Sequence, residues 1–205
     1  MCIACLAVLQ ESSEAFTETK KNPTYRTSQI ERRGFLLAAM SFSFLGTKAN
    51  AQIPGANRIN LPDTPDDGPE IPEFVTQFPG MLGGFLGLAT MFQGTPVIFY
   101  DPGWISRVGG PSSPGFRFMR AHEYAHHRLS HAMRSIMALN QGNFLFGYTQ
   151  EVEADCWAAE TLALQGDGAA VRAGANLYAN VLPPFDTQGR PGGQVRLETI
   201  SRCAR

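Results

Sequence analysis

Residues 122–126 read His-Glu-Tyr-Ala-His, the HExxH pattern of zinc hydrolases. On a helix, residues four apart lie on the same face, so His122 and His126 can both reach one metal ion. Glu123 follows the first histidine, where its carboxylate can take a proton from a water held by that ion. All four histidines of the chain lie between residues 122 and 131. The pattern predicts a helix that carries two metal ligands and a general base.

A second acidic motif, the EVEAD sequence at 151–155, lies in a segment that is typical of another helix. A catalytic zinc usually has three protein ligands and one open position. The elongated form HExxHxxGxxH does not supply the third ligand here, because Leu129 and Ala132 stand where it has glycine and histidine. We therefore expect Glu151 to be the third ligand. Asp155, one turn later, is expected to accept a hydrogen bond from the free ring N–H of a ligating histidine.

Together the two motifs resemble those of gluzincin-type metallopeptidases with an HExxH…ExxxD arrangement. The chain is similar to short soluble relatives of the heat-shock and prenyl-protein membrane proteases, and its second motif is also similar to that of phage-repressor-cleaving metallopeptidases. The resemblance covers roughly residues 95–165. It implies a small zincin-like domain with one zinc ion at His122, His126 and Glu151, and with Glu123 as the catalytic base.

Other interpretations of the motifs remain open. Glu123-x-x-His126 is also half of a di-iron carboxylate site in a four-helix bundle, but that site needs a second such pair, and no histidine lies outside 122–131. The helix with the HExxH motif could also be merely polar, with histidines that bind no metal. If the zinc site is present but without turnover, the chain is a catalytically idle, zinc-stabilised binding or envelope-maintenance module. Glu123 would then have no chemical role.

The first 51 residues are predicted to be a leader with a twin-arginine-like signal peptide. Arg32 and Arg33 precede an apolar run at 35–45, and residues 49–51 form an Ala-Asn-Ala cleavage sequence. The run is too short to span a bilayer. We therefore expect cleavage after residue 51 and a periplasmic or secreted mature chain without a transmembrane span.

The mature chain would hold 11 arginines, no lysine and 14 acidic residues, which gives a formal net charge of 11 − 14 = −3. It has no basic stripe and no alternation of aromatic and basic residues. We therefore expect no nucleic acid partner. The resemblance to metallopeptidases implies a peptide or protein substrate.

Cys156 and Cys203 are the two cysteines that remain after removal of the leader. A pair of cysteines in an exported protein predicts a disulfide, which would tie the C-terminal helix to the helix that carries Glu151. The alternative is two buried free thiols.

The pattern of residues predicts an α+β fold that is mostly helical, with a short strand or sheet beside the HExxH helix. We expect a Pro-rich extended segment without a core of its own at 52–72, followed by the metallopeptidase-like domain at 73–205. Within this domain the expected elements are one or two short helices at 74–92, a strand at 96–100 closed by a turn at 101–103, the HExxH helix at 116–139, a helix ending near 165, and helices at 169–182 and 194–205.

Peptide hydrolysis also needs a donor that stabilises the oxyanion. The candidates are Arg196, Tyr148, Tyr178, His127 and His131, with Arg196 tested first. On one continuous helix, His127 and His131 would point away from the ligand face, so we expect both on the surface. The strand at 96–100 is expected either to pair with the substrate chain or to pack behind the helix, and the aromatic loop with Phe144 and Phe146 either to line a pocket or to join the core.

Overall fold

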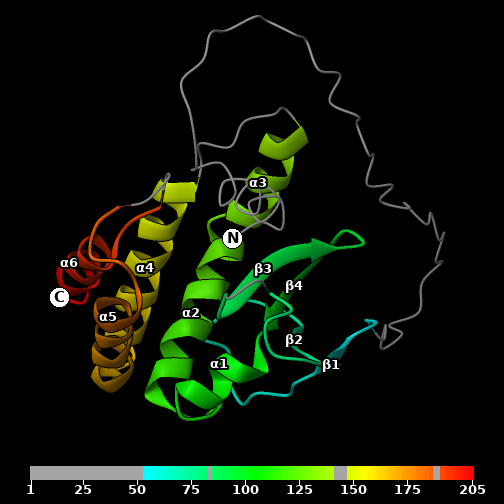
Figure 1. Ribbon diagram of the computed structural model, residues 1–205, viewed down its shortest axis with the longest axis horizontal. Coiled ribbons are helices and arrows are strands. Elements are labelled where there is room, and N and C mark those ends of the chain that lie inside the picture. Colours follow the sequence, from blue (N-terminus) through cyan, green and yellow to red (C-terminus); the bar gives the residue numbers. More distant parts are fainter. Residues whose placement is uncertain (1–52, 83–84, 141–146, 187–189) are drawn as a thin grey trace, which may run out of the picture.

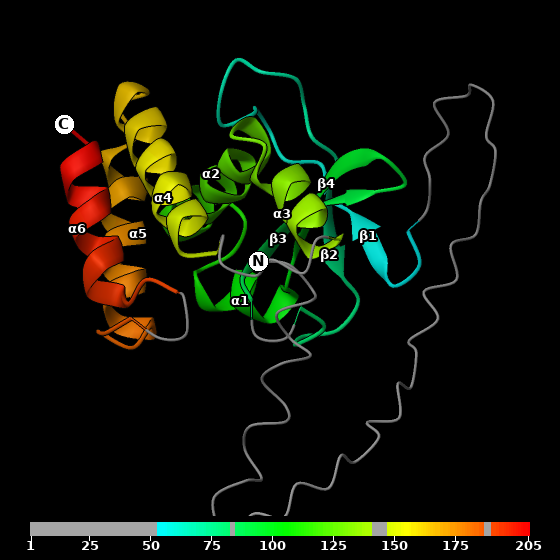
Figure 2. The same ribbon diagram turned by 90° about the horizontal axis from the view of Figure 1, so that it is seen from above.

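Helix α2 (Pro114–Arg128), which carries the HExxH motif, runs through the centre of the molecule (Figure 1). In this computed structural model the described residues are 53–82, 85–140, 147–186 and 190–205. A four-stranded sheet lies on one side of α2, and α4 (Gly147–Leu164), α5 (Gly168–Val181) and α6 (Gly193–Cys203) lie on the other (Figure 2). The predicted α+β fold with mostly helical content is confirmed. The predicted leader at 1–51 lies outside the described residues.

The sheet has the strand order β1-β2-β4-β3. Its strands are β1 (Ala56–Arg58), β2 (Glu73–Thr76), β3 (Gly87–Phe92) and β4 (Thr95–Tyr100). β4 pairs in parallel with β2 and forms an antiparallel hairpin with β3. The two residues between the hairpin strands, Gln93 and Gly94, both have positive φ, as a tight two-residue turn requires. β4 is therefore an inner strand, and β3 forms one edge of the sheet.

The prediction of helices at 74–92 is wrong, because β2 and β3 occupy this segment. The strand expected at 96–100 is present as β4, but it cannot pair with a substrate, since both of its edges are already paired. The turn expected after β4 opens a short helix, α1 (Pro102–Arg107), whose first backbone N–H groups donate to the Asp101 carboxylate.

The helix expected at 116–139 is interrupted. Ser113 caps the start of α2, where its hydroxyl accepts a hydrogen bond from the backbone N–H of Phe116. The helix ends at Arg128, and α3 (His131–Asn140) begins after two intervening residues. Ser130 has a φ of 60°, a left-handed conformation that cannot continue a right-handed helix. α3 therefore takes a new direction and packs against both α2 and β3.

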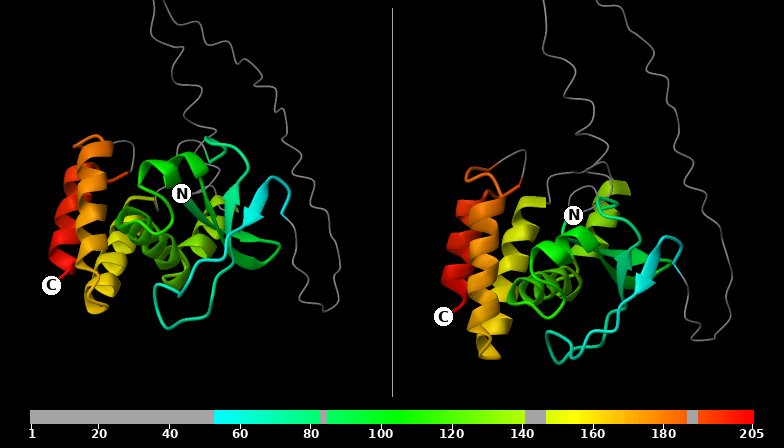
Figure 3. Two further views of the ribbon diagram at one scale, coloured as in Figure 1. Left: turned by 90° about the horizontal axis from the view of Figure 1, so that it is seen from below. Right: turned by 60° about the horizontal axis from the view of Figure 1, so that its bottom comes forward.

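Residues 59–72, here called the strap, form a long, bent loop that leaves β1 and returns to its antiparallel partner β2 (Figure 3). Arg128 holds the strap through an ion pair with Asp66 at 2.6 Å, and the Gln165 side chain donates to the carbonyl of Pro65 at 2.7 Å. The Pro-rich segment predicted at 52–72 thus contains β1 and a loop with several bends, and it is attached to the domain rather than independent of it.

Two hydrophobic clusters lie on opposite sides of α2. The cluster toward α4, α5 and α6 includes Phe118, Leu162, Tyr178 and Ile200, and the cluster toward the sheet includes Ile98, Tyr100, Phe116 and Tyr124. Gly174 allows α5 to approach α2 closely, because a Cβ at this position would lie 2.2 Å from the ring of Phe118. None of the described helices is both long and apolar enough to cross a bilayer.

The structure joins Cys156 of α4 to Cys203 of α6 by a disulfide with an S–S distance of 2.10 Å.

We expect replacement of either cysteine by serine to lower the free energy of unfolding by up to roughly 4 kcal/mol, because the bond closes a loop of 47 residues in the unfolded chain. Urea unfolding of the disulfide-bonded protein measures the loss. The two single variants and the double variant should lose the same amount, since each breaks one bond; additive losses would contradict the prediction.

Candidate metal centre

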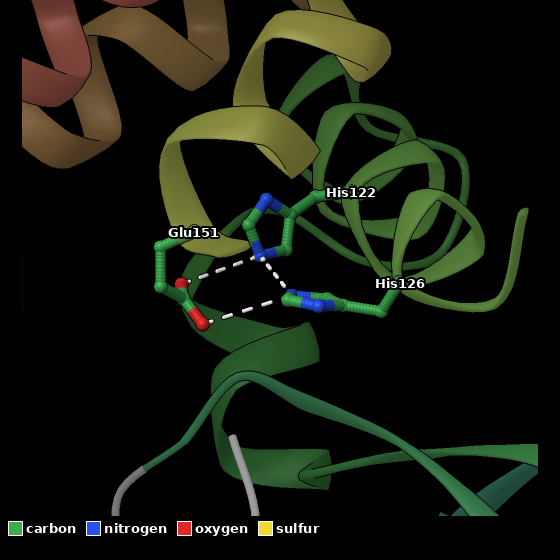
Figure 4. A group of neighbouring side chains, drawn as sticks. All are labelled: His122, His126 and Glu151. Carbon is green, nitrogen blue, oxygen red and sulfur yellow. Dashed lines mark hydrogen bonds and ion pairs between the residues drawn. The ribbon is translucent and has the colours of Figure 1, made fainter. Parts of the chain in front are cut away.

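His122 and His126 of α2 and Glu151 of α4 converge on one point, as Figure 4 shows. The Nε2 atoms of the two imidazoles lie 3.1 Å apart. The Nε2 atom of His122 is 3.5 Å from one carboxylate oxygen of Glu151, and that of His126 is 3.6 Å from the other. All three side chains are almost completely buried. The structure thus brings together the three residues that the sequence predicts as ligands.

The spacing of these atoms fits a small cation bound by nitrogen and oxygen. Ligands at about 2.0–2.1 Å from a tetrahedral zinc ion lie about 3.3–3.4 Å from one another. The two nitrogens are 3.1 Å apart, and each lies near this distance, at 3.5 and 3.6 Å, from a different oxygen of Glu151. Two neutral imidazoles and one carboxylate are also a ligand set that zinc accepts in catalytic sites. The residues present are therefore suited to hold zinc.

In the metal-free chain, the pKa values of His122 and Glu151 are shifted in opposite directions. Burial lowers the pKa of His122, but hydrogen bonds to Asp155 and Glu151 outweigh it and raise the pKa to about 9. Burial raises the pKa of Glu151, whereas the hydrogen bond with His122 and the charge of Arg196 bring it well below its usual range. Burial and the charge of His122 lower the pKa of His126 well below its usual range, so in the metal-free chain the positive charge lies on His122 and faces the Glu151 carboxylate.

Asp155 occupies the position expected for an outer carboxylate. Its Oδ1 atom lies 2.9 Å from Nδ1 of His122, and its side chain is completely buried. A hydrogen bond from this Nδ1 leaves Nε2 unprotonated and directed toward the centre. Asp155 reaches this place because it lies one turn after Glu151 on α4, on the same face of the helix.

The guanidinium of Arg196, on α6, is engaged by carboxylates. Its Nε and Nη2 atoms donate to Asp155 at 2.6 and 2.7 Å, and Nη1 lies 3.2 Å from Glu151. The group also stacks on the ring of Tyr178 at 3.6 Å from its centroid. The three side-chain nitrogens of Arg196 thus orient the two carboxylates of the centre, and its role as oxyanion donor stays a prediction.

His131 is not a surface residue, contrary to expectation. It is completely buried, its Nδ1 atom lies 3.2 Å from Nδ1 of His126, and its Nε2 atom lies 2.8 Å from Glu153. The expectation assumed a continuous helix, whereas the break before α3 turns this side chain back toward α2. His127 is half-buried and binds the carbonyl of Val97 in β4 through Nε2.

The carboxylate of Glu123 lies against the edge strand β3. It accepts a hydrogen bond from the backbone N–H of Ala89 at 2.8 Å, and Gly87 leaves the space that its other oxygen occupies. Burial raises the pKa of Glu123, although the charge of His122 and the Ala89 N–H oppose this rise. A raised pKa is the direction that a general base near neutral pH requires. The sequence did not predict a role for Ala89 or Gly87 in the site. Ala89 contributes only its backbone N–H, and Gly87 contributes only the absence of a side chain.

Replacing Gly87 by alanine should displace the Glu123 carboxylate, since a Cβ there would lie 2.6 Å from Oε1. Gly87 does not have the positive φ that would disfavour alanine, so the fold should tolerate the change. If Glu123 is the base, hydrolysis should fall on the order of 10²-fold, as expected for a misplaced catalytic group. Peptide hydrolysis and zinc content are measured together, and zinc content should stay constant. Gly168→Ala, at the start of α5, is the control; equal activity of both variants would contradict the prediction.

The remaining candidates have other surroundings. Tyr178 is buried and its hydroxyl donates to the sulfur of Met119 at 3.4 Å, and its role as oxyanion donor stays a prediction. Tyr148 lies in the first turn of α4, three residues before Glu151, and is partly exposed. Phe144 and Phe146, the other aromatic residues expected to line a pocket or join the core, lie outside the described residues. Tyr148 therefore stays a prediction as oxyanion donor.

Comparisons with protein-family models, with curated proteins and with solved structures give no match for this chain. The functional conclusions below therefore depend on the geometry of the centre and on the chemistry of its residues.

Proposed function

We propose that this protein is an exported zinc-dependent metallopeptidase that hydrolyses peptide bonds. The observation that carries the proposal is the buried Glu123 carboxylate, one residue from the ligand His122 and hydrogen-bonded to an edge strand. A structural metal site needs no additional carboxylate of this kind. The twin-arginine-like leader and the disulfide between Cys156 and Cys203 support export.

In the proposed reaction, His122, His126 and Glu151 would hold one zinc ion. The ion would polarise the scissile carbonyl and make water acidic enough to attack at neutral pH. Glu123 would take the proton of the attacking water through Oε1 and deliver it to the leaving amine, while Oε2 keeps its hydrogen bond to Ala89. Asp155 and Arg196 would keep the ligands in place and take no part in proton transfer.

The open edge of β3 supports a peptide as the substrate. In an antiparallel strand, alternate residues bond to the partner strand, and the intervening residues face outward. Leu86 accepts a hydrogen bond from Asp101 at the end of the hairpin, so the backbone groups of Gly87, Ala89 and Met91 face away from β4. The N–H of Ala89 already donates to Glu123, which leaves its carbonyl and the backbone groups of Gly87 and Met91 for a further strand. An extended peptide could add to this edge as a further strand and pass beside Glu123.

One observation favours the second candidate, an idle zinc-stabilised module. The hydrogen bond between Glu123 and Ala89 also anchors the sheet to α2, and this structural role alone could account for the carboxylate. The two candidates differ in turnover but agree in zinc content. A screen of fluorogenic peptides separates them: zinc-dependent cleavage supports the peptidase, and zinc binding without cleavage of any peptide supports the module.

Zinc content is the test that both candidates must pass. We expect about one zinc per chain in protein purified without added metal, as for a site with three protein ligands. The variant with both His122→Ala and His126→Ala should contain none. His127→Ala is the matched control, because this histidine binds the carbonyl of Val97 and should not alter zinc content. Elemental analysis that finds equal zinc in the double variant and the parent would overturn the ligand assignment.

A further inference from the structure

We propose that His131 and Glu153 are positioning residues that hold His126 in the tautomer able to bind the metal. This inference rests on the metal centre proposed above but not on its catalytic activity. It concerns a chain of two hydrogen bonds, from Nδ1 of His126 to Nδ1 of His131 at 3.2 Å and from Nε2 of His131 to Oε2 of Glu153 at 2.8 Å.

The carboxylate fixes the direction of every proton in this chain. Glu153 accepts, so Nε2 of His131 carries the proton that it donates. A neutral imidazole then has a lone pair on Nδ1, so His131 accepts from His126. His126 must therefore carry its proton on Nδ1. Its Nε2 atom, 3.6 Å from Glu151, is left with the lone pair that a metal requires.

The two ligating histidines are thus oriented by different means. Nδ1 of His122 faces the buried Asp155 directly at 2.9 Å. Nδ1 of His126 faces an imidazole, which connects it to Glu153, a carboxylate whose side chain is 46% exposed. Both arrangements end in a carboxylate and both leave Nε2 free for the metal. This equivalence is the reason to assign His131 a role beyond filling space between α2 and α3.

The local fold supports this assignment. His131 is the first residue of α3, and the break at Ser130 directs its ring toward His126. On an uninterrupted helix, a residue five positions after His126 would point about 140° away from it. The left-handed conformation of a serine carries an energetic cost, which the buried hydrogen bonds of His131 help to offset.

Zinc affinity of purified protein, measured by competition with a chelator, tests the inference without any substrate. His131→Leu should weaken zinc binding roughly 10- to 100-fold, the usual effect of losing the outer partner of a ligating histidine. His131→Asn should retain most of the affinity, because its side-chain oxygen can replace Nδ1 as the acceptor. His127→Leu removes a neighbouring histidine that binds only the carbonyl of Val97, so its affinity should equal that of the parent.

Two results would overturn the inference. One is a His131→Leu variant that binds zinc as tightly as the His127→Leu control. The other is equal weakening by leucine and asparagine with equal losses of thermal stability in the metal-free protein, which would show that the histidine only packs. A parent chain that binds no zinc overturns both this inference and the proposed function, whereas zinc binding without peptide cleavage removes only the latter.

Nitrogen-detected NMR of the zinc-loaded parent gives a second measurement that packing alone would not change. We expect the proton on Nδ1 of His126 and on Nε2 of His131. A proton on Nδ1 of His131 would overturn the inference directly, and this observation needs no variant to fold.

Discussion

Replacing Glu123 by glutamine is expected to reduce peptide hydrolysis on the order of 10²- to 10⁴-fold, the usual contribution of a general base. The amide has nearly the same shape as the carboxylate, and its oxygen can still accept the hydrogen bond from Ala89. The fold and the zinc content should therefore stay unchanged. Initial rates at saturating peptide, normalised to bound zinc, measure the effect.

The matched control is Glu160→Gln, the same substitution at an exposed position of the helix that carries Glu151. It should leave the rate unchanged. A Glu123→Gln variant that cleaves as fast as this control would exclude the proposed mechanism. If neither the parent nor any variant cleaves a peptide, Glu123 serves only to anchor β3, and the idle module becomes the better description.

Replacing Glu73 by alanine is expected to destabilise the protein by about 3–5 kcal/mol, the usual cost of breaking a buried ion pair on one side. Glu73 of β2 is buried and lies 2.7 Å from Nη2 of the buried Arg120 on α2. It also accepts hydrogen bonds from the hydroxyls of Tyr100 and Tyr124 at 2.7 and 3.1 Å. The variant would leave one buried charge and two buried hydroxyls without this acceptor.

Thermal unfolding monitored by circular dichroism measures this loss, which corresponds to a drop in Tm on the order of 10 °C for a domain of this size. Glu70→Ala is the control, because Glu70 pairs with Arg58 at 3.4 Å and both side chains are largely exposed. Such exposed pairs contribute about 0–1 kcal/mol. Similar losses in the two variants would mean that the buried network around Glu73 contributes no more than a surface pair.

The core of the candidate site could be predicted because helical spacing alone brings its residues together. His122 and His126 are one turn apart, as are Glu151 and Asp155, so each pair shares a helix face whatever the tertiary structure. The presence of two facing helices was enough to place the third ligand and the outer carboxylate. The disulfide followed from the count of cysteines that remain once the predicted leader is set aside.

The surroundings of His131 and Arg196 could not be predicted in this way. The helix ends at Arg128 without a glycine or proline, and the residue with positive φ is a serine, so no residue type marks the break. If α2 is assumed to continue past Arg128, His131 is predicted on the face that points away from His126. Arg196 reaches the centre from another helix, and only tertiary structure shows that two carboxylates already bind it.

The strands in the segment 74–92 could not be predicted for a different reason. β2 has only four residues, and β3 begins with a glycine, is buried over its first three residues and is partly buried over its last three. Neither strand therefore shows a clear alternation of apolar and polar side chains. The segment's glycines and apolar residues were interpreted as short helices. The glycine at the start of β3 is instead required by the close approach of Glu123.

Helix α2 presents two polar stripes on opposite faces. Arg120, Tyr124 and Arg128 bind Glu73 and the strap, whereas His122 and His126 face the metal centre. Contacts on both faces oppose rotation of α2 about its axis, so Glu73 and the strap help to fix the direction in which His122 and His126 point. Substitutions behind α2 should therefore reduce the fraction of binding-competent molecules and leave the intrinsic zinc affinity of the others unchanged. Substitutions of Asp155 or His131 should instead lower the affinity of every molecule in the population.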